Sequence, residues 1–344
     1  MAASCAISLP ILDDGPQRPA HAQGPRSLEA VRMLRISLTD RCNLRCRYCM
    51  PDEGVSFVEK ERLLDVDSIL SIARVAYGFG VRHFKLTGGE PTLRSDLIPV
   101  ISGLRSMAGV DISMTTNGIH LARMAAALRD AGLDRLTISI DSLRPIRYRD
   151  ITGGGRLESA LRGYEAAAEV LGPPKLNVVV MRGVNDDELV DFARFAIHHD
   201  STVRFIEFMP LGESPLADAD QAEVLVDAEE MVEVLSGDLG SLEPLRVGFD
   251  PGVGPARLFA CPGGRGRIGF IHAMSRPFCE SCNRLRLTAT GTLRSCLFDG
   301  GEVELSPLLG SGDDVMRDAF ARCTAFKPEV HRGRGERAMS SIGG

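Results

Sequence analysis

The cysteines are the residues whose type and spacing most clearly indicate chemistry in this sequence. The chain has nine, and the first group, spaced C-x₃-C-x₂-C, consists of Cys42, Cys46 and Cys49. A structural zinc site takes four ligands in a tetrahedron, whereas three thiolates in one loop suit an iron–sulfur cluster with one iron open to a further ligand. The loop therefore predicts an open cluster, and a zinc knuckle with a distant fourth ligand is the alternative.

A second group of three cysteines, spaced C-x₂-C-x₁₃-C, lies far along the chain and consists of Cys279, Cys282 and Cys296. Arg284 and Arg286 lie within it, and in an extended chain residues two apart point to the same face. Two guanidiniums beside a cluster predict a clamp for a triphosphate. The alternatives are a solvated charged strand for the arginines and a closed four-cysteine zinc or iron–sulfur site that includes Cys261.

Composition and charge narrow the class of protein. Of the 344 residues, 44% are hydrophobic and 25% are charged, which is typical of two domains or one large barrel with an extension. The net charge of −6 argues against broad binding to nucleic acid or anionic membranes. We predict a cytoplasmic protein for three reasons. The cysteine count is odd, the leader over 1–26 has no signal-peptide features, and no apolar run is long enough to span a membrane. In that reducing compartment, clustered cysteines indicate metal or redox chemistry.

Elements that could position these residues alternate along the first two thirds of the chain. Short runs rich in Val, Ile and Thr predict strands at Leu34–Leu38, His83–Thr87, Asp111–Thr115, Leu136–Ile140, Leu176–Met181 and Val203–Met209. Segments of helical periodicity lie between them at Val66–Tyr77, Asp96–Ser106, His120–Ala131, Leu157–Val170 and Asp187–His198. Six strands separated by helices predict an α/β fold, an incomplete TIM-type barrel of about six βα units, with a doubly wound sheet as the second choice.

The pattern changes after about residue 212. A helix is expected at Ala228–Leu235, and β-like runs at Ile268–Ile271 and Arg284–Ala289 follow a stretch rich in Gly and Pro. We therefore predict a smaller C-terminal domain that carries the second cysteine group. The predicted units are the flexible leader at 1–26, the partial barrel at 27–244 and the C-terminal domain at 245–344.

The first cysteine group directly follows the first strand, which is where barrels place their chemistry. The next strand ends in Thr87-Gly88-Gly89-Glu90-Pro91. Two glycines let a ligand approach the backbone closely, and Glu90 offers a carboxylate to an ammonium group. Taken alone, this segment could equally be an ordinary turn.

The three-cysteine loop, with Tyr48 before its last cysteine, resembles the signature of the radical S-adenosylmethionine superfamily. The complete set of motifs is similar to the GTP 3′,8-cyclase family, also called the molybdenum cofactor biosynthesis protein A family. The second cysteine group, its two arginines and the terminal Gly-Gly carry this narrower resemblance. The matching stretches are Ser37 to Cys49, Thr87 to Arg94, Thr115 to Gly118, Asn177 to Asp187, Arg204 to Met209, Phe278 to Leu297 and Gly343-Gly344.

The resemblance implies a lyase that performs the first step of molybdenum cofactor biosynthesis. It would convert GTP to (8S)-3′,8-cyclo-7,8-dihydroguanosine 5′-triphosphate, through a 5′-deoxyadenosyl radical that removes the 3′ hydrogen of the ribose. The implied cofactors are two [4Fe–4S] clusters and S-adenosylmethionine, and the implied substrate is GTP. The implied partners are an electron donor, a successor enzyme and a second copy of the chain in a homodimer.

The resemblance also assigns roles to individual residues. The first cluster would be held by Cys42, Cys46 and Cys49, and the second by Cys279, Cys282 and Cys296. S-adenosylmethionine would be contacted by Tyr48, Gly89, Glu90, Ser139 and Met209. GTP would be bound by Arg35, Lys85, Thr115, Lys175, Arg204, Arg284 and Arg286. The residues implied to act most directly in the reaction are Arg35, Arg284, Arg286, Gly343 and Gly344.

Two positions depart from the family pattern. Lys85 stands where an arginine is common, which keeps the charge but loses a bidentate fork. His83 stands where a second basic residue, often lysine, is usual. Neither departure touches a cluster ligand, so they bear on the affinity for GTP and not on the reaction.

Two other functions are compatible with parts of the sequence. One is a radical S-adenosylmethionine enzyme that modifies peptides and carries an auxiliary cluster, although it would leave the paired arginines unexplained. The other is a zinc-binding interaction module without catalytic activity. Iron and zinc content, and the dependence of S-adenosylmethionine cleavage on GTP, distinguish the three.

Overall fold

A computed structural model of the chain describes residues 24–50, 55–212, 216–245, 254–298, 300–337 and 339–343. Most of the predicted leader and the predicted site residue Gly344 lie outside these residues. No helix among the described residues is long and apolar enough to cross a membrane.

Six parallel strands form the centre of the sheet, and all six were predicted from the sequence to within two residues at each end. Their aliphatic side chains pack under the surrounding helices; in the first strand, Leu34 and Ile36 are fully buried against that layer. The strands are β1 Met33–Ser37, β2 His83–Thr87, β3 Asp111–Thr116, β4 Arg135–Ser139, β5 Lys175–Val180 and β6 Thr202–Glu207.

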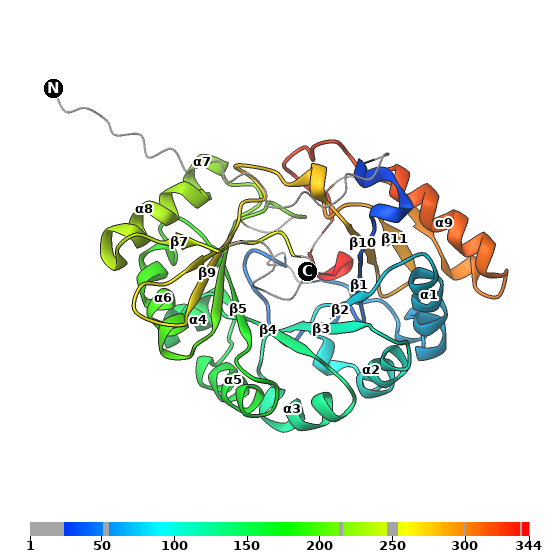
Figure 1. Cartoon of the computed structure of the whole chain (residues 1–344), viewed down its shortest axis with the longest axis horizontal. Helices are drawn as coiled ribbons and strands as arrows, with labels where there is room; N and C mark the ends of the chain where they lie inside the picture. Colours follow the sequence, from blue (N-terminus) through cyan, green and yellow to red (C-terminus); the bar gives the residue numbers. More distant parts are fainter. Residues whose placement is uncertain are drawn as a thin grey trace.

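The helices lie on the outside of the curved sheet, and their apolar faces pack on it (Figure 1). The five predicted between strands are confirmed as α1 Val66–Gly78, α2 Leu97–Arg105, α3 Leu121–Asp130, α5 Leu157–Leu171 and α6 Leu189–His198. Gly80, Gly132 and Gly172 have positive φ values of 111°, 102° and 78° just past helix ends, a backbone conformation that favours glycine. The short helix α4, Pro145–Ile151, was not predicted.

The later part of the chain adds strands to both edges of this sheet. β10, Arg284–Leu287, pairs in parallel with β1, and β9, Arg267–Ile271, pairs in parallel with β6. Antiparallel strands extend each edge further: β11 Thr292–Arg294 and β12 Glu302–Glu304 beyond β10, and β8 Arg257–Ala260 and β7 Glu243–Pro244 beyond β9. Within the described residues β12 and β7 are the two ends of the sheet, so the barrel is open.

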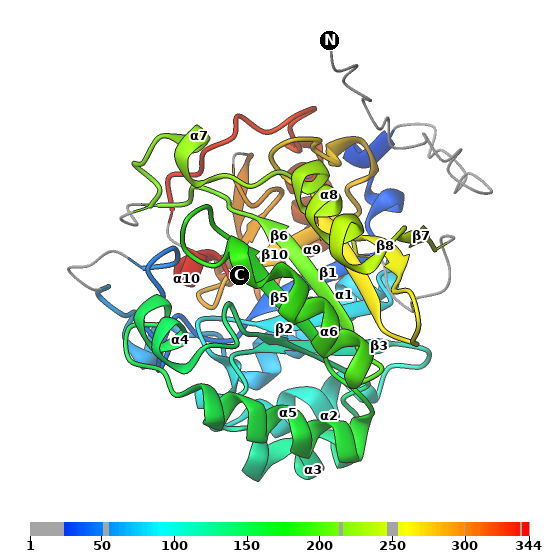
Figure 2. The ribbon, with the colours of Figure 1, turned by 90° about the vertical axis from the view of Figure 1, so that its left-hand side faces the viewer.

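The remaining helices cover the later strands and one end of the barrel. They are α7 Gln221–Val224, α8 Ala228–Leu239, which contains the predicted helix, α9 Asp313–Ala325 and α10 Met339–Ile342. α8 packs beside α6, and seen from the side α10 lies beside the mouth of the barrel (Figure 2). The division of the chain at residue 244 stays a prediction.

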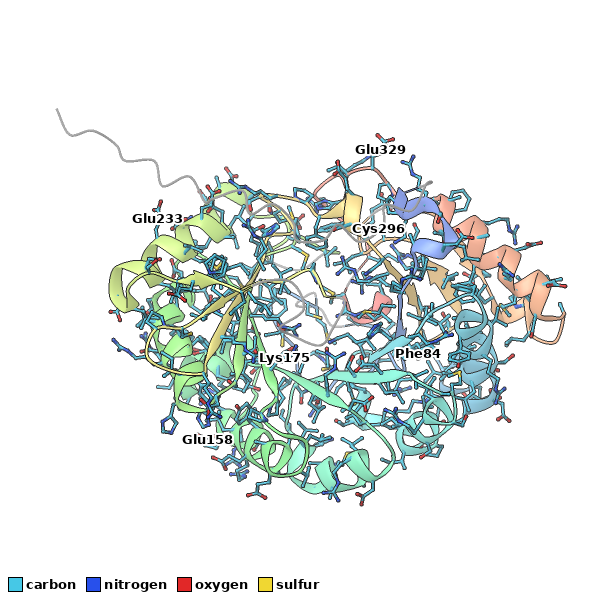
Figure 3. All side chains as sticks on the ribbon, viewed as in Figure 1. Phe84, Glu158, Lys175, Glu233, Cys296 and Glu329 are labelled. Carbon is cyan, nitrogen blue, oxygen red and sulfur yellow. The ribbon has the colours of Figure 1, made fainter. Side chains whose placement is uncertain are left out.

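Register across the sheet determines which side chains share the barrel interior. Arg286, Arg35 and Lys85 are direct neighbours on β10, β1 and β2. Since alternate residues of a strand point to opposite faces, and the residues flanking Arg35 are buried beneath the helices, these three cations face inward. Carboxylates such as Glu158, Glu233 and Glu329 lie on the outer rim, whereas Lys175 and Cys296 lie closer to the barrel axis (Figure 3).

Candidate active site

The first cysteine triad lies in the loop that leaves the C-terminal end of β1, as predicted. This loop packs on the segment after β2 by backbone contact: Gly89 N–H donates to the Thr39 carbonyl at 2.6 Å, and Glu90 N–H donates to the Arg41 carbonyl at 2.8 Å. A Cβ on Gly88 would lie 2.5 Å from the Thr39 oxygen, and one on Gly89 would lie 2.4 Å from the Arg41 oxygen. The two glycines are therefore needed for the approach of another loop, a reason that sequence analysis did not give.

Glu90 connects three loops at this end of the barrel. Its carboxylate is 1% exposed and accepts hydrogen bonds from the Thr92 N–H (3.0 Å), the Thr92 hydroxyl (2.6 Å), the Thr116 hydroxyl (2.7 Å) and the Asn117 N–H (2.7 Å). The Asn117 amide in turn donates to Asn43 of the cysteine loop at 2.7 Å. Three of the four bonds go to Oε1, so Oε2 keeps an acceptor position for the predicted ammonium.

Tyr48 fixes the same loop from the other side. Its hydroxyl donates to Asp141 Oδ2 at 2.8 Å, and Asp141, just past β4, accepts from the Val179 N–H at 2.8 Å. Burial raises the pKa of Asp141 to about 6. Burial, and the charges of Cys49, Asp141 and Cys42, raise the pKa of Cys46 well above its ordinary value. The three thiols therefore lie in an environment that by itself does not favour the thiolate form. Bound iron would supply the positive charge that stabilises the thiolates.

The other residues predicted to contact S-adenosylmethionine also lie at the C-terminal ends of strands. Ser139 is the last residue of β4 and lies in register with Asn177 of β5. Met209 lies two residues past β6 and is half-buried. The structure thus brings these positions to the same end of the barrel as the cysteine loop, and their contacts with the cofactor stay predictions.

The barrel interior next to this end is crowded with cations. Burial, and then the charges of Arg286, Arg284 and Arg204, lower the pKa of Arg35 well below its ordinary value. The pKa of Lys85 is lowered in the same way, by burial and then by Arg204, Arg35, Arg135 and Lys175. The charged groups with the largest effects on both residues are all cations, so an anion bound here would relieve their repulsion.

Two buried polar atoms in the same space have no hydrogen-bond partner among the described residues, namely Thr115 Oγ1 and Asn177 Oδ1. Asn177 is the register neighbour of Arg204, whose Nη2 donates to the Thr137 hydroxyl at 3.0 Å. Since unpaired buried polar atoms are costly, these two atoms indicate a place for a ligand. Thr115 was predicted from the sequence as a site residue and Asn177 was not, although an amide within the otherwise apolar run from Leu176 to Met181 was a usable signal.

His83 does not join this cationic group. Its Nδ1 lies 3.0 Å from Asp111 Oδ2, and Asp111 also pairs with Arg135. Although burial opposes it, the hydrogen bonds from His83 and Arg135 lower the pKa of Asp111 to about 2. The unusual histidine is therefore held by a carboxylate of the chain itself, at the start of β2.

The second cysteine triad lies at the opposite end of the sheet from the first. Cys282 precedes β10, which runs parallel to β1, and the carbonyl of Asn283 next to it accepts hydrogen bonds from the residues that open β1. Cys296 follows the antiparallel strand β11 and so returns to the same end. The charges of Cys296 and Cys282 add to burial in raising the pKa of Cys279, which places the three thiols together. The cationic interior thus lies between the two triads.

Two cations lie against the second triad. Although burial opposes it, the charges of Arg284 and Lys327 lower the pKa of Cys282 to about 6. The Arg284 guanidinium also stacks 4.8 Å from the centre of the Phe278 ring. Lys327 was missed by sequence analysis because nothing in its sequence neighbourhood connects it with a cysteine some forty residues earlier.

Cys261 is not brought to this triad. It lies in the apolar core after β8, its N–H bonded to the Gly266 carbonyl at 3.0 Å, and burial alone raises its pKa to about 11. Among the described residues no three Cys, His, Asp or Glu side chains converge on one metal ion. Each of the two groups provides three thiols, and this donor set fits a cluster with one open iron better than a closed zinc site with four ligands.

The end of the described chain enters the mouth of the barrel (Figure 1). The Gly343 carbonyl accepts a hydrogen bond from Arg286 Nη1 at 2.5 Å, and Ile342 is buried. Gly343 has a φ of +77°, and a Cβ there would lie 2.8 Å from Ser37 Cβ and 3.4 Å from Thr87 Cγ2. The tail thus packs on the ends of β1 and β2, above the cations.

Comparison with known proteins identifies the family. Residues 36–196 match the Radical SAM superfamily, and residues 201–333 match the family Molybdenum Cofactor Synthesis C. The chain is 45% identical over 323 residues to the GTP 3′,8-cyclase of Moorella thermoacetica, covering 91% of this chain and 98% of that protein. It is 43% identical over 327 residues to that of Heliobacterium modesticaldum, with the same coverage. The chain belongs to the GTP 3′,8-cyclase family.

Solved structures agree on the fold. The crystal structure of Streptococcus suis SuiB bound to S-adenosylmethionine superposes with a TM-score of 0.59 at 14% identity, covering 84% of this chain and 66% of that one. The structure of the same protein bound to its precursor peptide SuiA superposes with a TM-score of 0.54. At this identity the likeness concerns the fold alone, which is the partial barrel that the alternation of strands and helices predicted.

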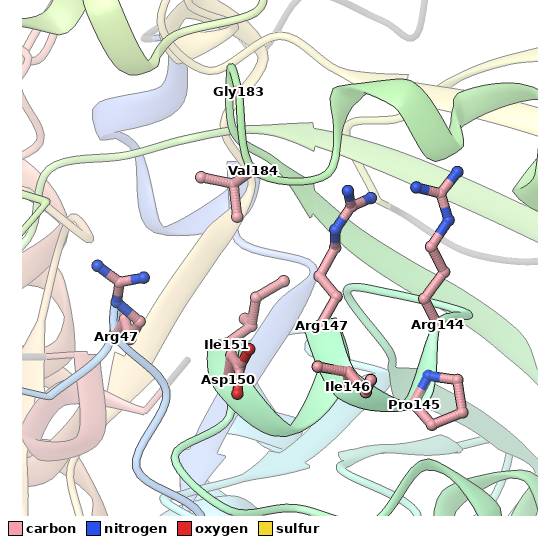
Figure 4. Close-up of a pocket in the computed structure, with 9 residues that line it drawn as sticks. All are labelled: Arg47, Arg144, Pro145, Ile146, Arg147, Asp150, Ile151, Gly183 and Val184. Carbon is pink, nitrogen blue, oxygen red and sulfur yellow. The ribbon is translucent and has the colours of Figure 1, made fainter.

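A surface depression outside the barrel interior lies beside the first cysteine loop (Figure 4). Part of its lining comes from Arg47 of that loop, from Arg144 and Arg147 of the α4 region, and from Gly183. Arg144 and Arg147 both pair with Asp187, so much of their charge is already neutralised. None of the residues predicted from the sequence lines this depression.

Proposed function

We propose that the chain converts GTP to (8S)-3′,8-cyclo-7,8-dihydroguanosine 5′-triphosphate, with S-adenosylmethionine and two [4Fe–4S] clusters as cofactors. The observation that carries the proposal is the set of buried and half-buried, mutually repelling cations between two cysteine triads. A nucleotide triphosphate is an anion that matches this interior, and the family's relatives bear the name of that reaction.

The first triad fits a cluster through its donor set, since three thiols share one loop and no fourth thiol lies there among the residues that the structure describes. The bound cluster would supply the electron that cleaves S-adenosylmethionine and so generates the radical that removes the ribose hydrogen. The chain itself would hold the cofactors and the substrate and orient them. Glu90 joins the loops after β2 and β3 to the cysteine loop, and Tyr48 secures that loop to the end of β4.

The cationic interior would bind and orient GTP. We assign the triphosphate to Arg35, Lys85 and the cations around them, because bidentate and charge-assisted hydrogen bonds to phosphate are among the strongest that side chains make. The unpartnered Thr115 hydroxyl and Asn177 amide oxygen are further candidates for polar contacts with the nucleotide. Cys279, Cys282 and Cys296 would hold the second cluster, which would supply an open iron as a ligand for the guanine base. The Gly343 tail would close the mouth of the barrel and exclude water from the radical.

Several broader features follow from the family assignment and belong to the same proposal. We infer that the chain works in the cytoplasm, forms a homodimer, takes electrons from a separate donor and passes its product to a successor enzyme. A peptide-modifying enzyme is not favoured, because a peptide gives no reason for so many cations in the barrel interior.

The test is an anaerobic assay of the reconstituted full-length chain with S-adenosylmethionine and dithionite, with and without GTP. We expect about eight irons per chain, cleavage of S-adenosylmethionine that depends on GTP, and a cyclised nucleotide triphosphate in the products. The matched control is the C42A/C46A/C49A variant, which should bind about four irons and form no product. Cleavage that is indifferent to GTP, or stoichiometric zinc in place of iron, would contradict the proposal.

A further inference from the structure

A buried lysine to which the proposed reaction assigns no role lies against the second cysteine triad. Lys327 follows α9 and is 3% exposed. Its Nζ donates to Cys282 Sγ at 3.4 Å, to the Arg284 carbonyl at 2.5 Å and to the Ser295 carbonyl at 3.4 Å. An ammonium group carries three protons, so all three are engaged and one of them points at a predicted cluster ligand.

The two carbonyls connect the lysine with both segments that carry the triad. Arg284 lies two residues after Cys282, and Ser295 immediately precedes Cys296. One ammonium therefore joins the start of β10 to the end of β11, on the side of the sheet where the three thiols meet.

The position of Lys327 is fixed through its backbone as well. Its N–H donates to the Thr324 carbonyl at 3.1 Å, and its carbonyl accepts from Arg26 Nε at 2.8 Å. A long side chain that is fixed both at its backbone and at its ammonium group loses little further conformational freedom when a cluster binds. The cation is thus placed in advance of the cofactor.

The residue type is informative because the chain rarely uses lysine. Only four of its forty basic residues are lysines, and of these Lys60 is exposed on the surface. Arginine presents a flat fork of donors, whereas lysine presents a compact charge with three donors around one atom. Three acceptors around one point, as at Lys327, require the second arrangement.

We infer that Lys327 is a positioning residue for the second cluster, and that its ammonium, bonded to the Cys282 sulfur, stabilises the reduced state of that cluster. The inference rests on the proposed second cluster. One-electron reduction makes a cluster more negative by one charge, so a fixed adjacent cation stabilises the reduced form more than the oxidised form. Hydrogen bonds to the sulfurs and net charge are among the factors that set cluster potentials.

The experiment isolates the second cluster in the C42A/C46A/C49A background, with dithionite as the source of the electron and electron paramagnetic resonance as the readout. At a potential where half of this parent is reduced, K327M is expected to show a ratio of reduced to oxidised cluster about tenfold lower, which corresponds to a midpoint about 59 mV more negative. K327R keeps the charge and should recover part of the difference. K60M, at the exposed lysine, should match the parent.

An intact cluster in K327M with the parent's ratio would overturn the inference, because the nearby charge would then have no effect on reduction. If K327M in this background does not assemble the cluster, the same substitution is made in the otherwise unchanged chain. The iron content and the melting temperature of that variant then decide between a role at the cluster and a role in packing. Loss of about four irons with an unchanged melting temperature supports a role specific to the cluster. Loss of both clusters, or a lowered melting temperature, indicates a packing role and overturns it. A parent that binds no iron refutes the proposed second cluster itself, with Lys327 still present.

Discussion

Replacing Arg286 with methionine is expected to stabilise the protein in the absence of nucleotide. Burial, and then the charge of Arg284, lower the pKa of Arg286 from 12.5 to about 10. A cation whose pKa falls on folding costs stability wherever it is charged, here at every pH below about 10. At about 1.4 kcal/mol per pH unit, the cost is about 3 kcal/mol. The hydrogen bond to the Gly343 carbonyl offsets about 1 kcal/mol of this, so R286M should gain about 2 kcal/mol.

The same substitution is expected to weaken GTP binding, because it removes a cation from the interior that the triphosphate would neutralise. Loss of a charged hydrogen bond is worth about 1.5–3 kcal/mol, or roughly a 10- to 100-fold rise in Kd. Denaturant unfolding under anaerobic conditions, with and without GTP, measures both effects. R129M, at an exposed arginine paired with its neighbour Asp130, should change neither. An R286M variant that is less stable than the parent without GTP, or binds GTP equally well, would refute the reasoning.

Three further substitutions test other parts of the site. E90Q places an amide among four donors in a buried position and should destabilise the chain by about 2 kcal/mol in denaturant; unchanged stability would contradict its role in joining the loops. Hydrogen bonds from His83 and Arg135 hold the pKa of Asp111 at about 2 against the effect of burial, so the stabilisation by this carboxylate is complete above about pH 4 and is lost as the pH falls towards 2. D111N should therefore cost about 2 kcal/mol at pH 7 and show a flatter loss of stability in acid, and a parallel acid profile would count against this. G343A brings a Cβ to 2.8 Å from Ser37 and should reduce turnover about tenfold or more with iron content unchanged. G310A, which has a φ of +81° and open space around it, is its control, and equal losses in the two would show that backbone strain alone is responsible.

The central strands and helices were predictable because each depends on local pattern. The run from Leu176 to Met181 is almost continuously apolar, as expected of a strand in a parallel sheet, and the glycines after α1, α3 and α5 mark helix ends. The helix α4, Pro145–Ile151, was missed because it is too short to show a helical period.

The arrangement of the site was only partly predictable, because it depends on contacts between distant segments. The sequence indicated that Arg284 and Arg286 belong near a cluster, but only the parallel pairing of β10 with β1 shows that the second triad lies at the opposite end of the sheet from the first. Lys327 could not be found from spacing, since its link to Cys282 is purely tertiary. The contact of Gly88 with the cysteine loop was not predicted, because a glycine pattern does not tell whether a ligand or another loop makes the close approach.

The pairing of β1 with β10 also has a consequence for how the protein is made. The two strands are separated by about 250 residues, so during synthesis at about 5–20 residues per second the edge of β1 waits roughly 10–50 s for its partner. An unpaired strand edge is a template for association with other chains. The nascent chain thus carries its first cysteine loop beside an open edge until the segment with the second triad emerges, and a chaperone or a neighbouring nascent chain has that interval in which to bind it.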